Sequence, residues 1–363
     1  MRIAALLLCL VAWTTTGTAQ ESASTSKLSF KTFAKGFEEP VGLLTVPEEP
    51  GKLFVVEREG SVRILENGKT NHRELLDIED ILAPEENPGL SSIAFPGDYA
   101  TSKVFYVSYT DKQGDTIIGR FPSKRSEAAN EEDLVVVLKV VQPFPHFHRS
   151  YLAFGPDGYL YLALGDSPHK KGAPSLAQNP QSLFGKVLRI DVSDPQRYSI
   201  PTDNPFAQGK GGAPEVWASG FQQPKHLSFD VKTKHLFLVD SGKDVQEIDL
   251  VERGKNYGWS IVEGSECSSP KCATSSLTRP IYSYHGSAVG GFIYSGDLHK
   301  DLKGSYIFAD TTSKILYKLT NSGTEWKSSP LGSSKSPLVA LGQGPAGAIY
   351  AAMQDGTIAS VEP

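Results

Sequence analysis

The sequence is poor in the residues that would mark several classes of protein. Among its 363 residues there are only 3 Cys, 2 Met and 4 Trp, and 36 basic residues are balanced by 41 acidic ones. A nucleic-acid-binding surface needs clustered positive charge, so no DNA or RNA partner is expected. Charged residues make up 21 % of the chain with both signs in balance, which excludes a disordered polyelectrolyte.

Long hydrophobic runs are also missing. The apolar run at residues 3–13 has eleven residues, whereas a helix needs about 20 to span a bilayer. This run follows a short basic start and precedes the small residues Gly17-Thr18-Ala19, a pattern typical of a secretory signal. We therefore expect a signal peptide at residues 1–19 and a secreted or periplasmic protein at residues 20–363, with no membrane span.

The expected mature chain contains only two cysteines, Cys267 and Cys272. In an oxidising compartment two such cysteines are expected to form a disulfide. Two free thiols are the alternative. Because the ring that the bridge closes is short, its stabilising effect should be below the ~3 kcal/mol estimated for a fifteen-residue loop.

Glycine, proline and aromatic residues are abundant, and they point to short strands joined by turns. Glycine and proline together make up about 16 % of the chain, above the average of about 12 %. One pattern, a strand core of four apolar and aromatic residues, recurs six times with starts 43 to 76 residues apart. The six copies are Leu53–Val56, Val104–Val107, Leu160–Ala163, Leu236–Val239, Tyr306–Ala309 and Ile349–Ala352.

Each copy is interpreted as part of an antiparallel sheet. In several copies a turn and an alternating strand follow, as in Glu59–Leu65 and Asp355–Val361. A single sheet cannot bury both of its apolar faces, but radial stacking against neighbouring sheets buries them. Repeated four-stranded units of this kind are typical of propellers. We predict an all-β fold, a single six-bladed β-propeller over residues 20–363. Two separate β domains are the alternative.

Two further expectations follow from the propeller. Residues 28–33 alternate between apolar and polar, so they are predicted to complete the C-terminal blade and close the ring. The long gaps at residues 168–214 and 263–287 are predicted to be excursions on one face of the disc, where functional sites are usually found.

Five segments follow one another along the chain in a recognisable order: Leu53–Gly60, Phe154–Asp166, Gly185–Asp191, Ile200–Phe206 and Asn256–Trp259. They resemble the soluble pyrroloquinoline-quinone-dependent glucose and sorbosone dehydrogenases and the related hedgehog-interacting-protein ectodomains. The resemblance covers nearly all of the expected mature chain. Each segment is weak evidence alone, but their order makes the set specific. The resemblance implies a six-bladed propeller, in agreement with the repeats.

The resemblance also implies a chemistry: a pyrroloquinoline quinone over the central channel, a calcium ion on its quinone oxygens, and a histidine that takes the sugar hydroxyl proton. Calcium prefers oxygen ligands and withdraws electron density from a carbonyl. A neutral imidazole can accept a proton near neutral pH. The implied partners are a sugar substrate and an electron acceptor.

The histidine position departs from the family pattern. An ungapped alignment puts Phe147 where the family has its base, between His146 and His148. In an extended segment these two histidines point to the same side, so a shift of one residue would bring either into the channel. His146 and His148 are therefore the candidate catalytic residues, and ordinary surface histidines are the alternative interpretation.

The predicted cofactor-binding positions carry less positive charge than in the family. Gln222 and Gln223 stand where the family usually has Arg-Asn before a proline, and Lys314 stands where members often have arginine. A quinone with three carboxylates favours guanidinium groups, so these changes should weaken its binding. Gln222, Gln223 and Lys314 remain the candidate cofactor residues.

The implied calcium site falls on the turn before Glu247-Ile248-Asp249. Main-chain carbonyls supply most ligands in this resemblance, so Gly242 and Lys243 are the candidate metal ligands. A simple blade turn with solvated acidic residues is the alternative.

The function that the sequence favours is an exported, quinone-dependent sugar dehydrogenase. The missing base and the missing arginine favour a different class, a non-catalytic propeller that binds a glycan or a protein on the same face. A calcium-dependent lactonase is a third possibility, but no spacing of carboxylate and amide residues in the sequence demands it.

Overall fold

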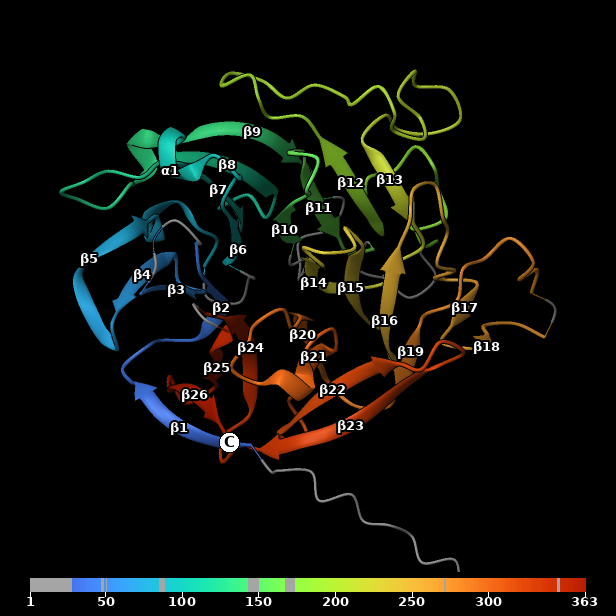
Figure 1. The fold of residues 1–363 in the computed structure, drawn as a ribbon. Coiled ribbons are helices and arrows are strands. Elements are labelled where there is room, and N and C mark those ends of the chain that lie inside the picture. Colours follow the sequence, from blue (N-terminus) through green and yellow to red (C-terminus); the bar gives the residue numbers. More distant parts are fainter. Residues whose placement is uncertain are drawn as a thin grey trace, which may run out of the picture.

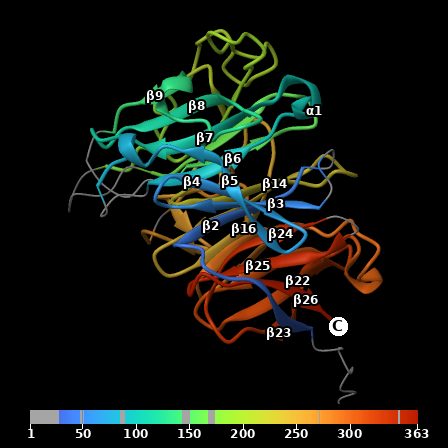
Figure 2. The same ribbon diagram turned by 90° about the vertical axis from the view of Figure 1, so that its left-hand side faces the viewer.

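A computed structural model shows six four-stranded antiparallel sheets arranged around a central axis (Figure 1). A side view shows the sheets stacked beside one another as blades (Figure 2). The residues that it describes are 28–46, 49, 51–84, 89–142, 150–166, 174–270, 272–344 and 347–363, with only the backbone of His72. The predicted all-β, six-bladed propeller is confirmed.

The blades follow one another along the chain, from the innermost strand of each to the outermost. Blades 1 to 3 consist of β2 (Pro40–Leu44), β3 (Lys52–Glu57), β4 (Ser61–Glu66) and β5 (Lys69–Asp77); β6 (Leu90–Ala94), β7 (Val104–Thr110), β8 (Thr116–Pro122) and β9 (Val135–Val140); and β10 (Ser150–Phe154), β11 (Leu160–Leu164), β12 (Lys186–Ile190) and β13 (Val216–Ser219). Blades 4 to 6 consist of β14 (Pro224–Phe229), β15 (Leu236–Ser241), β16 (Gln246–Val251) and β19 (Tyr282–Tyr284); β20 (Ala288–Ile293), β21 (Tyr306–Asp310), β22 (Ile315–Asn321) and β23 (Trp326–Ser333); and β24 (Leu338–Gln343), β25 (Ile349–Met353), β26 (Ile358–Glu362) and β1 (Ser29–Ala34).

Short helices and one extra hairpin decorate the blades. The hairpin consists of β17 (Val262–Glu263) and β18 (Glu266–Cys267). The short helices are α1 (Tyr99–Ser102), η1 (Glu79–Ile81), η2 (Glu131–Asp133) and η3 (Lys300–Leu302). Within the described ranges, no helix combines the length and the apolar character needed to cross a membrane.

The six repeated strand cores are the second strands of the six blades, and nearly all of their residues are buried. Each second strand is apolar on both faces because neighbouring blades cover both. In β3, for example, Phe54 and Val56 pack between blades 1 and 2, whereas Leu53 and Val55 pack between blades 1 and 6. Burial of both faces between neighbouring blades therefore explains why the same apolar strand core recurs six times in the sequence.

The N-terminal strand closes the ring. β1 pairs with β26 in an antiparallel register that joins Phe30 to Val361 and Lys31 to Ser360, and Figure 1 shows the blue strand beside the red ones. Phe30 also packs against the apolar cluster between blades 5 and 6. The prediction that residues 28–33 complete the C-terminal blade is confirmed.

The long gap at residues 168–214 is not one excursion. β12 lies within it and pairs with β11 and β13. Because β12 crosses the blade, residues 174–185 lie at the end of the channel where β10 begins, and residues 191–215 lie at the opposite end. The prediction that this whole insertion occupies one face is wrong, since it contains a strand of the blade.

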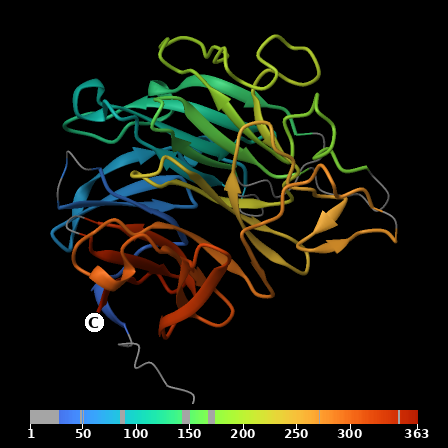
Figure 3. The same cartoon turned by 45° about the vertical axis from the view of Figure 1, so that its right-hand side comes forward.

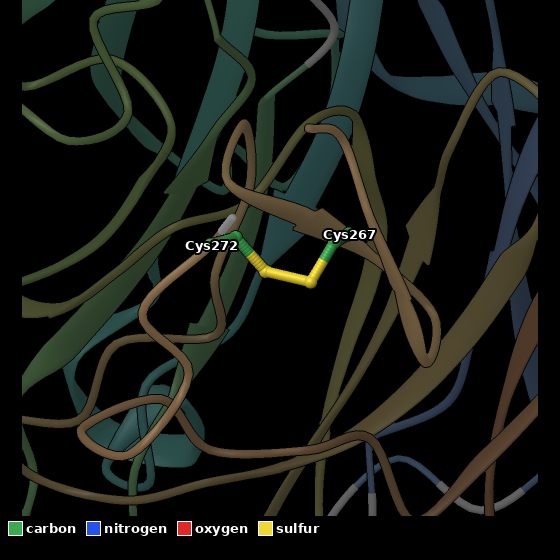
Figure 4. The surroundings of a disulfide bond; sticks show 2 residues. All are labelled: Cys267 and Cys272. Carbon is green, nitrogen blue, oxygen red and sulfur yellow. A yellow bond between two sulfur atoms is a disulfide. The ribbon is translucent and has the colours of Figure 1, made fainter. Parts of the chain in front are cut away.

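The second insertion carries the β17–β18 hairpin, which projects from the edge of blade 4 (Figure 3). The Glu263 carboxylate holds it to the β15–β16 turn by accepting hydrogen bonds from the backbone N–H groups of Asp244 (2.8 Å) and Val245 (3.2 Å). Cys267 and Cys272 form the expected disulfide beside this hairpin (Figure 4), with their Cα atoms 5.9 Å apart.

Removal of β1 tests the closure. A chain that starts at residue 35 leaves β26 as an exposed edge, whereas a control chain that starts at residue 20 keeps β1. We expect urea unfolding to show a loss of at least about 2 kcal/mol for the shorter chain, since burial of one large apolar side chain alone contributes roughly 1.5–3 kcal/mol. We also expect self-association through the open edge. Equal unfolding midpoints and equal solubility would contradict this closure.

Candidate functional site

A cavity of about 790 Å³ occupies the centre of the propeller. The innermost strand of every blade contributes to its wall, and most of the wall is apolar. Val41, Ile93, Leu152, Leu227, Val289 and Val339 each come from a different innermost strand. A largely apolar, concave cavity with a few polar groups is the usual form of a small-molecule site.

One end of this channel gathers most of the positions that the sequence singled out. All six innermost strands begin there, and we call this end the site rim. The β3–β4, β15–β16 and β21–β22 turns lie at the same rim because the strands within a blade are antiparallel. Arg58, Gln223 and Lys225 line the channel near this rim. The Arg58 guanidinium also forms an ion pair with Glu39.

Gln222 and Gln223 are held by the buried Asp240 of β15. Its two carboxylate oxygens accept hydrogen bonds from the backbone N–H groups of Gln222 (2.7 Å) and Gln223 (2.6 Å). Burial raises the pKa of Asp240 to about 7, although these two hydrogen bonds oppose the shift. Gln223 lines the channel and Gln222 does not. The segment that precedes β14 is therefore fixed by its backbone, and its side chains are free to vary.

Gly242 and Lys243 form the β15–β16 turn at the site rim, outside the channel wall. The N–H of Gly242 donates to the Val245 carbonyl at 2.8 Å, and a Cβ at Gly242 would lie 2.2 Å from a carboxylate oxygen of Glu263. The Lys243 ammonium is exposed and pairs with Asp244 at 3.7 Å. Carbonyl and carboxylate oxygens thus gather at Gly242, and these are the donors that calcium prefers.

Lys314 lies on the β21–β22 turn, with a left-handed backbone (φ 60°), and its ammonium donates to the Lys335 carbonyl at 3.3 Å. It is not part of the channel wall. His146 and His148 lie outside the described residues. The first described residue after them, Ser150, begins β10 at the site rim.

The channel wall contains a histidine that the sequence reasoning missed, His226 of β14. Burial lowers its pKa to about 4, against a smaller opposing effect from a hydrogen bond with the Gly291 backbone. The imidazole is therefore neutral at neutral pH. The sequence did contain a signal, because residues 224–229 precede the repeated core at 236–239 and must form the innermost strand of that blade.

A buried group of carboxylates lies between blades 3 and 4, behind the channel wall. Asp240 and Glu247 are register partners, and Asp249 lies two residues farther along β16. Asp249 is fully buried, and within the described part of the chain neither of its carboxylate oxygens has a hydrogen-bond partner. Burial, and then repulsion from Glu247 and Asp240, raise the pKa of Asp249 well above its ordinary value.

Metal-binding geometry is limited in the described ranges. No group of three or more His, Cys, Asp or Glu side chains in them is arranged to hold a metal ion. Any calcium at the Gly242 turn would thus depend on backbone carbonyls together with the Glu263 carboxylate.

The fold and the channel define a class of protein, a six-bladed propeller with a small-molecule cavity on its axis. Residues 37–360 match the model of the Glucose / Sorbosone dehydrogenase family, which is most of the chain. The chain therefore belongs to this family. It is a family of quinone-type sugar dehydrogenase propellers that also includes hedgehog-interacting proteins.

The curated relatives include both hedgehog-interacting proteins and sugar dehydrogenases. The chain is 30 % identical to the human Hedgehog-interacting protein over 324 residues, covering 82 % of this chain and 44 % of that protein. It is 26 % identical to the aldose sugar dehydrogenase YliI of Escherichia coli over 300 residues, covering 81 % and 68 %. It is 34 % identical to the HIPL1 protein of Arabidopsis thaliana over 221 residues, covering 52 % of this chain and only 32 % of that relative.

Solved structures agree with the fold. The PQQ-bound form of aldose sugar dehydrogenase from Streptomyces coelicolor is similar, with a TM-score of 0.71 and 26 % identity, over 93 % of this chain and 98 % of that one. A putative glucose dehydrogenase from Thermus thermophilus has a TM-score of 0.75 at 23 % identity, over 92 % and 99 %, and supports the fold alone.

The depressed pKa of His226 predicts a pH dependence of stability. Between pH 6.5 and about 4 the unfolded chain binds a proton on this imidazole and the folded chain does not, so the stability of the wild type falls as pH falls through this window. His226→Gln removes this loss. We expect the variant to gain up to about 2 kcal/mol relative to the wild type between pH 7.5 and pH 5.

Urea unfolding at both pH values measures this effect. His235→Gln is the control, because His235 is exposed on the β14–β15 turn. A relative stability of His226→Gln that does not change with pH would contradict an imidazole that stays neutral in the folded chain.

The buried Asp249 predicts the opposite dependence. Its pKa is higher in the folded chain, so stability is lost as pH rises through the region between the unfolded and the folded value. Asp249→Asn should therefore become more stable relative to the wild type as the pH rises from 5 to 8 in the presence of EDTA. Thermal and urea unfolding measure this difference, with exposed Glu252→Gln as the control. A variant that is less stable at pH 8 than at pH 5, relative to the wild type, would refute it.

Proposed function

We propose that the protein is an exported sugar dehydrogenase that oxidises an aldose hydroxyl with pyrroloquinoline quinone and calcium. The observation that carries this proposal is the axial cavity of about 790 Å³, with apolar walls and basic side chains near one rim, in a chain of the Glucose / Sorbosone dehydrogenase family. The electron acceptor that reoxidises the quinone is a further partner. The apolar run at residues 3–13 supports export.

The residues of the channel fit such a cofactor. Its flat aromatic rings require apolar walls, and its carboxylates require cationic or N–H donors. Arg58 and Lys225 supply positive charge near the site rim, and Gln223 supplies amide donors. Lys314 adds a positive charge at the same rim, outside the channel wall. The oxygens around Gly242 and Lys243, including the Glu263 carboxylate, fit a hard cation such as calcium.

The chemistry divides between the cofactor and the chain. When bound, the quinone supplies the acceptor for the two electrons and the hydrogen that leave the sugar carbon. The chain must hold the sugar at the channel, exclude water and take the hydroxyl proton. We assign this proton to the imidazole of His146 or His148, because a neutral imidazole is an acceptor near neutral pH.

A second candidate function is a non-catalytic propeller that binds a glycan or protein. It is favoured by the neutral Gln222 and Gln223 at a rim where an anionic cofactor needs positive charge, and by the similarity to the Hedgehog-interacting protein. The two functions differ in whether the quinone is retained.

Reconstitution separates these functions. The purified chain is mixed with pyrroloquinoline quinone and calcium, passed over a gel-filtration column, and assayed for dye reduction with a panel of aldoses. We expect quinone absorbance to co-elute with the protein and dye to be reduced, and we expect EDTA treatment before loading to lower both. Arg58→Met should weaken quinone retention at least about tenfold if a guanidinium contact contributes about 1.5–3 kcal/mol.

The control for the charge change is Arg197→Met, because Arg197 is exposed and, among the residues that the structure describes, pairs only with Asp194. Its retention of the quinone should equal that of the wild type. If the wild type retains no quinone and reduces no dye with any aldose, the dehydrogenase is rejected and the binding propeller becomes the better account.

A further inference from the structure

Several polar side chains in the channel wall connect neighbouring blades. The Ser92 hydroxyl accepts a hydrogen bond from the Leu152 N–H at 2.9 Å. The hydroxyls of Thr45 and Thr311 donate to the carbonyls of Gln343 (2.8 Å) and Leu338 (2.9 Å). These groups have a structural partner and offer little to a ligand.

Four polar groups in the wall differ from these: Ser91, Tyr151, Gln223 and His226. In the described part of the chain, the hydroxyls of Ser91 and Tyr151 and the side-chain amide of Gln223 form no hydrogen bond with the protein, and the His226 ring forms one with the Gly291 backbone. Ser91 lies on β6, whereas the other three lie on the neighbouring strands β10 and β14 or directly before β14. Three of these four groups are thus on one side of the channel.

The position of the imidazole is determined by packing on both sides. Its ring contacts Tyr151 edge to face, with ring centroids 6.4 Å apart. On the other side it lies against the backbone of Gly290, where an added Cβ would come within 1.9 Å of the His226 Cβ. The absence of a side chain at Gly290 therefore makes room for His226 in the wall.

The chemistry of this side of the channel favours a neutral ligand with hydroxyl groups. No Asp or Glu is among the described residues of the channel wall, so a cation has no counter-charge there. The basic groups that would attract an anion, Arg58 and Lys225, lie near the rim. A neutral imidazole, a phenol and an amide offer hydrogen bonds to hydroxyls, and the adjacent apolar wall suits the C–H faces of a sugar ring.

We infer that Tyr151, Gln223 and His226 form a sugar-binding subsite within the channel wall, where the imidazole accepts a hydrogen bond from a hydroxyl group of an aldose. The subsite rests on the proposed function for its ligand class, but it does not require the quinone. It assigns His226 a role in binding and leaves the proton acceptor of the oxidation unchanged.

Binding of aldoses to the quinone-free protein tests the subsite. D-glucose, D-galactose and D-xylose are titrated into the full mature chain, and binding is followed by calorimetry and by the ¹⁵N signals of the histidine rings. We expect saturable binding of at least one aldose, with a shift of the His226 ring nitrogen. His226→Phe, which keeps the ring packing but loses the acceptor, should weaken binding at least about tenfold.

Two further variants and a pH series test whether the neutral His226 imidazole is the group that binds the aldose. His226→Gln, which keeps an acceptor, should lose less than His226→Phe, and His235→Phe on the exposed β14–β15 turn should bind like the wild type. Because the imidazole stays neutral, affinity should be constant from pH 7 to pH 5. A loss of affinity with a midpoint near 6.5, as for an ordinary exposed histidine, would overturn the assignment.

The outcomes separate the subsite from the proposed function. If the wild type binds no aldose, or if His226→Phe binds as tightly as the wild type, the subsite is wrong even when the loaded protein reduces dye. If aldose binding depends on His226 while no quinone is retained, the subsite holds and the dehydrogenase fails.

Discussion

Burial of both faces of every blade is the constraint on which the rest of this structure depends. A four-stranded sheet with two apolar faces is insoluble alone, and it becomes stable only between two similar sheets. Six apolar clusters fill the six interfaces between neighbouring blades. The last interface depends on the pairing of β1 with β26, because the first and last parts of the chain must share blade 6. Closure of the ring therefore fixes the diameter of the channel.

The same constraint separates the parts of the molecule that can change from those that cannot. The four-residue cores of the second strands lie between two packed faces, so these core residues must stay apolar. The turns at the site rim are held by backbone contacts, as in the pairing of Asp240 with the N–H groups of Gln222 and Gln223. Side chains on these turns can vary without loss of the fold. This explains in physical terms how one family of propellers can include dehydrogenases and hedgehog-interacting proteins.

The sequence predicted the features that repeat and missed those that depend on single contacts. The six strand cores and the closing strand were recognisable because burial on both faces leaves an apolar signature. β12 was hidden within a presumed insertion because its sequence, Lys186–Ile190, contains two basic residues. Both are buried: the Lys186 ammonium donates to the carbonyls of Ala177 and Phe184, and the Arg189 guanidinium packs on aromatic rings and pairs with two aspartates.

The candidate site was predictable only in outline. Gln222, Gln223, Gly242, Lys243 and Lys314 all lie at the site rim, as the family pattern implies, but only Gln223 lines the channel. Which side chain faces the axis depends on the local twist and on β-bulges, such as the register shift between Pro224 and His226. A pattern of residue types does not encode that shift, so the sequence indicates that His226 is on an innermost strand but not that its ring faces the channel.

The most direct test of the account is a crystal structure of the protein grown with pyrroloquinoline quinone and calcium. The account predicts density for a flat ring system at the site rim, over the axial cavity, with carboxylates near Arg58 and Lys225 and a cation at the oxygens around Gly242. An unchanged, empty channel at saturating quinone, or a quinone bound at the opposite end of the propeller, would contradict it.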